Sequence, residues 1–593
     1  MPARSTLTPP GPDVATGAVV AAGPMPVPAG TPSLRVRWLG TVPYDEALSL
    51  QRGLHARGDH GRGTGDHLLL LEHPHVYTLG RHADPSHVLV DPAAVGAEVV
   101  DVDRGGDVTY HGPGQLVAYP IVELPPMAGG TRPSVRAWVH LLEQALIDAL
   151  VELGLPGAGR HDGYPGVWVE PGTPQARKIA AIGVRVERGR SMHGVALNVS
   201  PDLSMFGHIV PCGIAEHGVT SLAAEGVDVP MAAAVDAFVR SFTALRGDVV
   251  VDRADVVGPR RGGGDEDLAP FSRGAGPGER TTGANATVGG ASVRLLGRLA
   301  QAGVTESVAL TDRKPDWMRA RVHHGPEVLS VRRTLRDLEL VTVCEEAGCP
   351  NLSECWADGT ATFMVCGERC TRACGFCLVD TRHPEPLAAD EPDRVAEAVA
   401  RMGLEHAVVT MVARDDLPDG GAAHVAATVS AIHARRPGTR VEVLISDLRG
   451  SAADLDVVLA AGPEVVNHNV ETVPRLQRAV RPSAGYARSL ALLARAAAAG
   501  HVTKSGLVVG LGETEDEIVG TLADLAAVGV SIVTIGQYLR PTSHHLPVAR
   551  WWEPADFERF GAFGRELGLG HVESSPFTRS SYHARAAADG AGA

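Results

Sequence analysis

Short apolar runs recur through the second half of the chain, separated by stretches long enough to form helices. Six of these runs have the length and composition of strands: TFMV near 362, AVVTMV near 407, VEVLIS near 441, EVVNHNV near 464, GLVVGLG near 506 and IVTIGQYL near 532. Between them lie helix-length segments such as EPDRVAEAVARM and YARSLALLARAAAA. Strands that alternate with helices favour a parallel β/α barrel, open or closed, with its chemistry at the carboxyl ends of the strands.

The first half of the chain shows a different pattern. The segments HLLLLEHPHVYTLG and KIAAIGVRVERGRSMHGVALNV contain alternating β-branched residues and end in turn residues, which is typical of strands. Residues 134–153 and 230–245 have the pattern of helices. This combination predicts a mixed α/β domain before the barrel.

A Gly-rich stretch with little periodicity separates the two patterns, and we expect it to be a flexible linker. The first residues of the chain are rich in Pro, Ala and Gly and indicate a disordered tail. The predicted organisation is therefore a tail at 1–32, an α/β domain at 33–250, a linker at 251–310 and a second domain at 311–593. Because no core-like periodicity crosses the break, halves cut near residue 275 should each fold.

Composition and charge exclude several classes of protein. Of the 593 residues, 44% are hydrophobic and 21% charged, and no apolar run approaches the roughly 18 residues of a membrane helix. The net charge of -15 argues against broad binding to nucleic acid or anionic lipid, although a local basic patch for an acidic carrier protein stays open. The beginning of the chain has no signal-peptide pattern, so we expect a cytoplasmic protein.

Cysteine is distributed unevenly. Of the eight cysteines, Cys212 stands alone in the first half and the other seven lie between positions 344 and 377. Such crowding favours a metal site over disulfides. A zinc site is one interpretation, since a C-x2-C pair such as Cys374 and Cys377 is common there, and a zinc-stabilised binding scaffold is the corresponding hypothesis without chemistry.

A second interpretation starts from the spacing C-x3-C-x2-C of Cys370, Cys374 and Cys377. Three thiolates on one loop can hold three irons of a [4Fe–4S] cluster and leave the fourth iron open to a small molecule. Beside Phe376, just after the first barrel strand, the motif resembles that of radical S-adenosylmethionine enzymes. The resemblance implies that S-adenosylmethionine binds the open iron and is cleaved to a 5'-deoxyadenosyl radical.

A second triplet, Cys344, Cys349 and Cys355, has the more specific spacing C-x4-C-x5-C. With the first triplet it resembles lipoyl synthases, over roughly 311 to 585. Further matching motifs are KPDWMRAR, ARDDLPDGGA, NHNVETVPRL, KSGLVVGLGET, GQYLRPTSHHLPV and RSSYHA. The resemblance implies two [4Fe–4S] clusters, of which an auxiliary cluster is dismantled for its sulfur.

In that family a serine of the RSSY motif completes the auxiliary cluster, which implies Ser581 here, with Ser580 as the adjacent alternative. Cys366 belongs to neither triplet, and we interpret it as a small buried residue at a strand end rather than a substitute ligand. Met411 stands where the family usually has a small polar residue.

The first domain contains four further motifs: RGGDVTYHGPGQ, RKIAAIGVRV, MHGVALNV and PCGI. A lone cysteine is by default a buried small residue, and a catalytic one needs a cation in contact. The ordered motifs resemble lipoyl(octanoyl) transferases over roughly 35 to 245. The resemblance implies that Cys212 accepts an octanoyl group as a thioester and that Lys178 favours its thiolate. An ATP-dependent lipoate or biotin ligase of the same fold would need no cysteine.

The same resemblance implies a set of residues around the acyl chain. They are Arg104, Gly105, Gly106, Asp107, Val108, Thr109, Tyr110, His111, Ala181, Ile182, Gly183, Gly194, Val195 and Ala196.

The sequence thus predicts two successive enzymes of lipoate synthesis in one α/β chain: a biotin/lipoate-ligase-like domain and a partial β/α barrel of radical SAM type. The implied partners are octanoyl-acyl carrier protein, lipoyl domains of 2-oxoacid dehydrogenase complexes, the glycine cleavage H protein, and an electron donor such as flavodoxin or ferredoxin. Neither nucleic acid nor membrane is expected. The alternatives are a chain in which only the lipoyl synthase half is active, or a first half that uses ATP.

Overall fold

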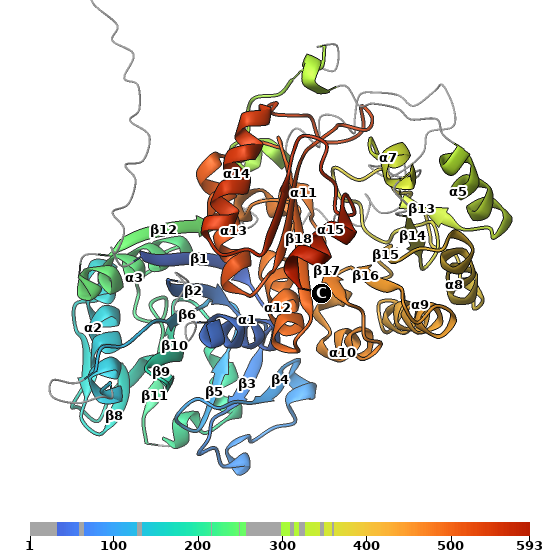
Figure 1. Ribbon diagram of the computed structural model, residues 1–593. Coiled ribbons are helices and arrows are strands. Elements are labelled where there is room, and N and C mark those ends of the chain that lie inside the picture. The colour runs from blue at the N-terminus through green and yellow to red at the C-terminus, as the bar shows by residue number, and fades with distance from the viewer. Residues whose placement is uncertain are drawn as a thin grey trace, which may run out of the picture.

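The computed structural model describes two α/β domains, each built around its own large sheet (Figure 1). The described residues are 33–57, 65–126, 133–214, 216–247, 249–256, 298–308, 313–318, 326–343, 349–357 and 361–592. The prediction of a two-domain α/β chain is confirmed. None of the described helices is both long and apolar enough to cross a membrane.

The first domain contains a large mixed sheet in the order β12-β1-β2-β6-β10-β9-β8-β7, with β11 paired to β9. Strand β1 is parallel to both of its neighbours, and the pairs from β2 to β7 are antiparallel. The strands are β1 (Ser33–Thr41), β2 (Asp66–Glu72), β6 (Gln115–Ile121), β7 (Ala158–His161), β8 (Tyr164–Val169), β9 (Arg177–Glu187), β10 (Arg190–Asn198), β11 (Gly218–Val219) and β12 (Val250–Asp255).

Helices cover both faces of this sheet. Alternate residues of β2 show why: Leu68 and Leu70 pack in a cluster with α2 (Val135–Glu152) and α3 (Met231–Arg246). Leu69 and Leu71 belong to another cluster, which includes residues of α1 (Tyr44–Arg57). A smaller sheet, β4-β3-β5, is formed by β3 (Val76–Leu79), β4 (Glu98–Asp101) and β5 (Val108–His111).

The second domain is an open parallel sheet that follows chain order from β13 to β20. Strands β14 to β20 are parallel, and β13 pairs antiparallel with β14. Their bounds are β13 (Val341–Thr342), β14 (Thr362–Val365), β15 (His406–Met411), β16 (Arg440–Leu444), β17 (Val465–Asn467), β18 (Val502–Val509), β19 (Ile532–Gln537) and β20 (His571–Ser574). All six predicted strands are present, and β13 and β20 were not predicted.

Helices lie before, between and after these strands, as expected for a partial β/α barrel. They are α5 (Pro326–Asp337), α7 (Leu352–Ala357), α8 (Glu391–Met402), α9 (Ala422–Arg435), α10 (Ala452–Ala460), α11 (Gln477–Val480), α12 (Tyr486–Ala498), α13 (Glu515–Ala527), α14 (Pro554–Glu566) and α15 (Ala584–Ala591). The predicted helices EPDRVAEAVARM and YARSLALLARAAAA correspond to α8 and α12.

The boundary region between the domains is described at its two ends. Residues of the expected linker form β12, which pairs with β1 and so belongs to the first sheet. At the other end, Leu299 and Ala302 are buried in a cluster with residues of both domains. The expected tail at 1–32 and the middle of the expected linker, 257–297, lie outside the described residues.

Candidate active sites

The first candidate site centres on Cys212, which lies in the short 3-10 turn Pro211–Gly213 with a left-handed φ of 57°. Lys178, on β9, is 8% exposed and directs its Nζ at the Cys212 Sγ, 3.6 Å away. Two contacts bring the segments together: Val219 of β11 pairs with Lys178, and the Thr220 amide donates to the Lys178 carbonyl. A thiol and an ammonium that are distant in sequence therefore meet.

An ammonium beside a sulfur favours the thiolate, which is the nucleophilic form of cysteine. The Lys178 Nζ also lies 4.8 Å from the centre of the Trp168 ring on β8, so the aromatic face helps to hold the cation where it is. Cys212 itself is partly exposed. The arrangement is that of an accessible nucleophile with a positive charge held beside it.

Cys212 opens onto a small cavity of about 50 Å³ at the junction of the two sheets of the first domain. Its lining residues come from α1, β5, β6, β9, β10 and the loop before β5. They are Tyr44, Arg104, Gly105, Gly106, Asp107, Thr109, His111, Val117, Tyr119, Ala181, Ile182, Gly183, His193, Gly194, Val195, Ala196 and Cys212.

Most of the residues expected around an acyl chain line this cavity, but Val108 and Tyr110 do not. Both lie on β5, where successive side chains point to opposite faces. Thr109 and His111 face the cavity, whereas Val108 and Tyr110 pack into an apolar cluster on the other side.

Four residues that line the cavity were not expected from the sequence: Tyr44, Val117, Tyr119 and His193. The alternation along β6 would have indicated Val117 and Tyr119, because it places them on one face, but nothing in the sequence places α1 beside them.

Charge around the cavity is concentrated in a few groups. The Arg104 Nη2 donates to both the carbonyl and the hydroxyl of Thr78, at 2.7 and 2.8 Å, so this buried guanidinium is fixed. Burial lowers the pKa of His111 to about 3, and its imidazole is neutral at physiological pH.

The backbones of β10 and β6 approach each other closely at the cavity. At Gly194 a Cβ atom would lie 2.1 Å from the Ala118 carbonyl oxygen, so only glycine permits this approach of β10 to β6.

The second candidate site is a cavity of about 570 Å³ at the carboxyl ends of the parallel strands. Residues at or just beyond the ends of β15 to β19 line it, including Met411, Ile445, Asn469, Val508 and Tyr538. This is where a β/α barrel places its chemistry. The prediction about the location of the second site therefore agrees with the geometry.

Five of the predicted metal-ligating cysteines line this one cavity: Cys349, Cys355, Cys370, Cys374 and Cys377. Ser580 and Ser581 also line it, from the segment before α15. Cys344 lies outside the described residues. Two neighbouring cysteine segments and a distant serine segment thus line the same space.

The loop of Cys370, Cys374 and Cys377 is fastened on several sides. The Gly375 amide donates to the Val480 carbonyl at 2.8 Å, and the Leu546 amide donates to the Gly375 carbonyl at 2.9 Å. Inside the loop, Arg372 makes a two-pronged pair with Asp415 at 2.7 Å for each contact. A rigid loop of this kind presents its three thiols in a fixed arrangement.

The buried thiols of the second cavity have raised pKa values, which suits the binding of a metal ion that displaces their protons. Burial raises the pKa of Cys374 to about 11, and it also raises the pKa of Cys370 and of Cys377. Without a metal these thiols stay neutral at pH 7, whereas an iron ion would exchange the protons for strong bonds to sulfur. Soft thiolate donors on one loop fit an iron–sulfur cluster.

The remaining segments of the cavity are tied to one another. The Asn351 Nδ2 donates to the Phe577 carbonyl at 2.7 Å, and the Tyr582 hydroxyl donates to Glu354 at 3.1 Å. These contacts join the segment of Cys349 and Cys355 to the segment of the two serines. The Ser580 Oγ accepts a hydrogen bond from Asn469 at 2.6 Å.

Two further predicted features have clear positions. Cys366 is fully buried directly after β14 and is not among the residues that line the cavity, as expected for a small residue at a strand end. Met411, at the end of β15, does line the cavity. The thioether therefore occupies part of the wall next to any bound cofactor.

Comparison with known proteins defines the class of each domain. A profile described as the lipoyl protein ligase A/B catalytic domain matches residues 43–243, and one described as the radical SAM superfamily matches residues 364–525. The chain thus joins a domain of the lipoyl ligase and transferase type to a radical S-adenosylmethionine domain.

Similar sequences define the family of the second domain more closely. Lipoyl synthase from Rubrobacter xylanophilus is 55% identical over 273 residues, which are 46% of this chain and 85% of the relative. Lipoyl synthase from Frankia alni is 53% identical over 273 residues, 46% of this chain and 83% of the relative. The chain belongs to the lipoyl synthase family. Membership implies S-adenosylmethionine and iron–sulfur clusters as cofactors.

Among solved structures, the bipartite lipoate protein ligase of Thermoplasma acidophilum, described with its E2 lipoyl domain, aligns with 38% of this chain and 88% of its own. Its sequence identity is 18% and its TM-score is 0.32.

Proposed function

We propose that the chain is a bifunctional enzyme of lipoate synthesis. Its first domain transfers an octanoyl group from acyl carrier protein to a lysine of a lipoyl domain, and its second inserts two sulfur atoms at C6 and C8 of that octanoyl chain. The single observation that supports the first step is the 3.6 Å contact between Lys178 Nζ and Cys212 Sγ.

The transfer proceeds in two steps at Cys212. Its thiolate attacks the carbonyl carbon of the octanoyl thioester, and the carrier leaves as a thiol. The amine of the incoming lysine then attacks the new thioester, so that an amide forms and the Cys212 sulfur is released. Lys178 stabilises the negative sulfur before the first step and after the second.

An ATP-dependent ligase is the competing function for the first domain. Such an enzyme activates a free acid with nucleotide and forms no thioester, so it gains nothing from a paired cysteine and lysine. The pairing of Cys212 with a buried cation favours the transferase.

In the second domain, Cys370, Cys374 and Cys377 hold the cluster that binds S-adenosylmethionine. Cys344, Cys349 and Cys355 hold the auxiliary cluster, and Ser581 completes it. The bound cofactors supply a radical strong enough to remove hydrogen from unactivated C–H bonds. The residues of this chain fix the loop that ligates the first cluster and enclose the acyl chain away from water.

The partners follow from the two reactions. Octanoyl-acyl carrier protein serves the first domain, lipoyl domains and the glycine cleavage H protein visit both, and a reductant such as flavodoxin or ferredoxin serves the second. We place the enzyme in the cytoplasm, where these partners occur.

One experiment separates transferase from ligase. The purified chain receives either octanoyl-acyl carrier protein without nucleotide, or octanoate with ATP, and octanoylation of a lipoyl domain is followed by mass spectrometry. We expect product only from the carrier thioester. Product from octanoate and ATP, with equal activity in Cys212→Ala, would establish the ligase instead.

A further inference from the structure

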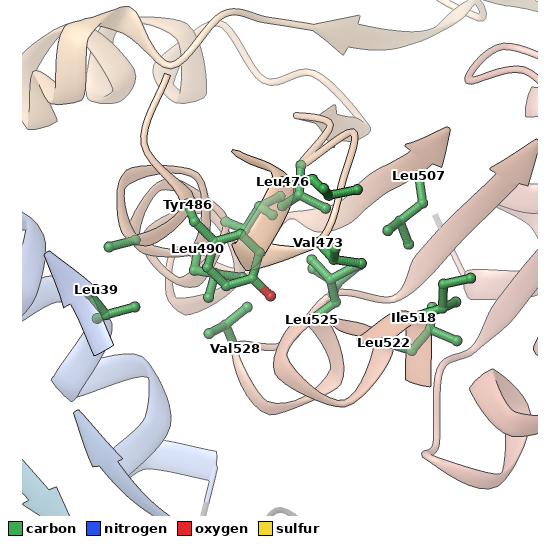
Figure 2. Close-up of a cluster of buried hydrophobic side chains, with 14 of the residues drawn as sticks. Leu39, Val473, Leu476, Tyr486, Leu490, Leu507, Ile518, Leu522, Leu525 and Val528 are labelled. Carbon is green, nitrogen blue, oxygen red and sulfur yellow. The ribbon is translucent and has the colours of Figure 1, made fainter. Parts of the chain in front are cut away.

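The two domains meet along helices α1 and α12, which lie side by side in Figure 1. Figure 2 shows the apolar cluster at this boundary, in which Leu39 of the first domain joins Tyr486 and Leu490 of the second. All three side chains are buried. The domains therefore share a continuous core rather than touching at a few surface residues.

Polar contacts within this boundary are also buried. The Arg37 guanidinium donates to both oxygens of Asp524, at 2.8 and 2.9 Å, and the Tyr486 hydroxyl donates to the same carboxylate at 2.9 Å. The side chains of Arg37 and Asp524 are only 3% and 4% exposed. Because separating a buried pair leaves uncompensated charge, the contact specifies one arrangement of the domains.

A second group of charges crosses the same boundary and leads to the cluster loop. Glu46, in the first turn of α1, accepts a hydrogen bond from Arg488 Nε of α12 at 2.7 Å. Arg488 also faces the fully buried Asp447, with 3.7 Å between Nη1 and Oδ2. At Gly450 a Cβ atom would lie 2.2 Å from the Glu46 carboxylate, so glycine makes room for this group.

Asp447 connects these residues to the cysteines. Its Oδ1 accepts a hydrogen bond at 2.6 Å from Arg372, which lies between Cys370 and Cys374. The Arg372 amide in turn lies 3.4 Å from Cys370 Sγ and donates to it. An alternating series of carboxylates and guanidinium groups thus runs from the first domain into the C-x3-C loop: Glu46, Arg488, Asp447 and Arg372.

We propose that helix α1 of the first domain is a working part of the second site, with Glu46 as a positioning residue for the loop that contains Cys370 and Cys374. Glu46 holds Arg488 away from full pairing with Asp447, so that Asp447 keeps its short contact with Arg372. This inference rests on the proposed role of the loop cysteines as iron ligands.

The reasoning depends on competition for one carboxylate. Among the described residues, Asp447 Oδ2 has no hydrogen-bond partner, and the nearby Arg488 is the group able to supply one. Burial raises the pKa of Glu46 to about 7, so its carboxylate is fully charged only above that pH. If the charged Glu46 is neutralised, Arg488 moves toward Asp447 and draws that carboxylate from Arg372. Arg372 then keeps only its pair with Asp415, and the part of the loop between Cys370 and Cys374 is held less firmly.

The test measures how firmly the loop holds its iron. In the full chain with Cys349→Ala and Cys355→Ala, only the loop retains iron, and its release to a ferrous chelator is timed with and without Glu46→Gln. At about pH 8.5, where Glu46 is ionised, we expect release to accelerate about three- to tenfold, the net size of one hydrogen bond. An unchanged rate would overturn the inference.

Two comparisons separate positioning from a general loosening of the boundary. Arg57→Ala removes a contact at the other end of α1, where Arg57 Nη2 donates to the Gly529 carbonyl at 3.2 Å, and should leave the release rate unchanged. In an Arg488→Met background, Glu46→Gln should have no further effect.

Equal acceleration by Arg57→Ala, or an undiminished effect of Glu46→Gln without Arg488, would contradict the proposal. Octanoyl transfer reports that the first domain of each variant is folded. If the loop holds no iron at all in the parent chain, the proposed function of the second site fails; if it holds iron that Glu46 does not affect, only this inference fails.

Discussion

The two sites differ in how far the folded chain completes them. In the first, Lys178 and Cys212 are already 3.6 Å apart and face a cavity of about 50 Å³, all within one domain. In the second, cysteines of two neighbouring segments and serines of a distant one line a cavity of about 570 Å³. The first candidate site is preassembled within one domain, whereas the second gathers donors from several segments around a much larger space.

This difference follows from the chemistry of each site. The Cys212 thiol and the Lys178 amine contact each other directly, and backbone pairing between β11 and β9 helps to bring them together. Buried thiols without a cation or metal stay protonated, as burial raises the pKa of Cys374 to about 11. Iron bound in the second site would link these segments and replace thiol protons with bonds to sulfur.

The largest expected effect is a loss of activity in the first site alone. Cys212→Ser should reduce octanoyl transfer by more than about a thousandfold, because a hydroxyl at neutral pH is far less nucleophilic than a thiolate. Sulfur insertion into a lipoyl domain that already bears octanoate should stay at the wild-type rate. Both are measured on the same preparation by mass spectrometry, with Cys366→Ala as the control cysteine, and undiminished transfer in Cys212→Ser would contradict the assignment.

The second prediction separates the roles of the two cysteine triplets in the second site. Replacing Cys370, Cys374 and Cys377 with alanine should stop cleavage of S-adenosylmethionine, because no open iron remains. Replacing Cys344, Cys349 and Cys355 should spare cleavage but stop product formation. Cleavage is followed by chromatography of 5'-deoxyadenosine.

The iron content of each triple variant supplies the control for this prediction. The intact chain should bind about eight irons, the content of two [4Fe–4S] clusters, and each triple variant about half of that. Two triple variants that both keep the full complement would rule out ligation by these cysteines.

The sequence indicated the residues of both candidate sites, the cysteine loop through its spacing and the pair of Cys212 and Lys178 through the resemblance of its motifs. The C-x3-C-x2-C spacing places three thiols on one loop, and period-two alternation would have separated Thr109 and His111 from Val108 and Tyr110 had it been applied to β5. Six strands of the barrel were recognisable as apolar runs, whereas β20 is short and has only Val572 buried.

The contacts between domains could not be predicted in the same way. Arg37 and Asp524 lie 487 positions apart, and each is an ordinary charged residue in its own segment. Helix α1 was missed because its buried residues serve two neighbours, the first sheet and α12, which weakens any single apolar stripe. The expectation that the two halves fold independently arose from the composition of the linker, and it remains a prediction. Separating the halves would expose the apolar residues that the two domains bury against each other.

The third effect compares the histidines of the two cavities. Burial lowers the pKa of His111, in the first cavity, to about 3 and that of His468, in the second, to about 4. A histidine in the unfolded chain has a pKa near 6.5, so between these values the unfolded state binds more protons. Each group's stability contribution is therefore complete above about pH 6.5 and lost as the pH falls, by about 2 kcal/mol at pH 5.

The matched variants His111→Gln and His468→Gln isolate these contributions. Each should flatten the pH dependence of its own domain's unfolding free energy by about 2 kcal/mol between pH 7 and 5. Urea unfolding followed by hydrogen exchange resolves the two domains. A variant that leaves the slope unchanged would show that its histidine has the same pKa in the folded and unfolded states, and the two cavities would then differ in polarity as well as in size.

The smallest effect examines the preassembly of the first site. If the Lys178 ammonium stabilises the Cys212 thiolate, Lys178→Ala should slow alkylation of Cys212 by iodoacetamide at pH 7 about tenfold. Arg177→Ala is the matched control, because it removes a positive charge at the preceding position of β9, where the side chain points to the opposite face and pairs with Glu225. Equal slowing by both variants would mean that overall positive charge, rather than the 3.6 Å contact, activates the sulfur; the first site would then be no more preassembled than the second.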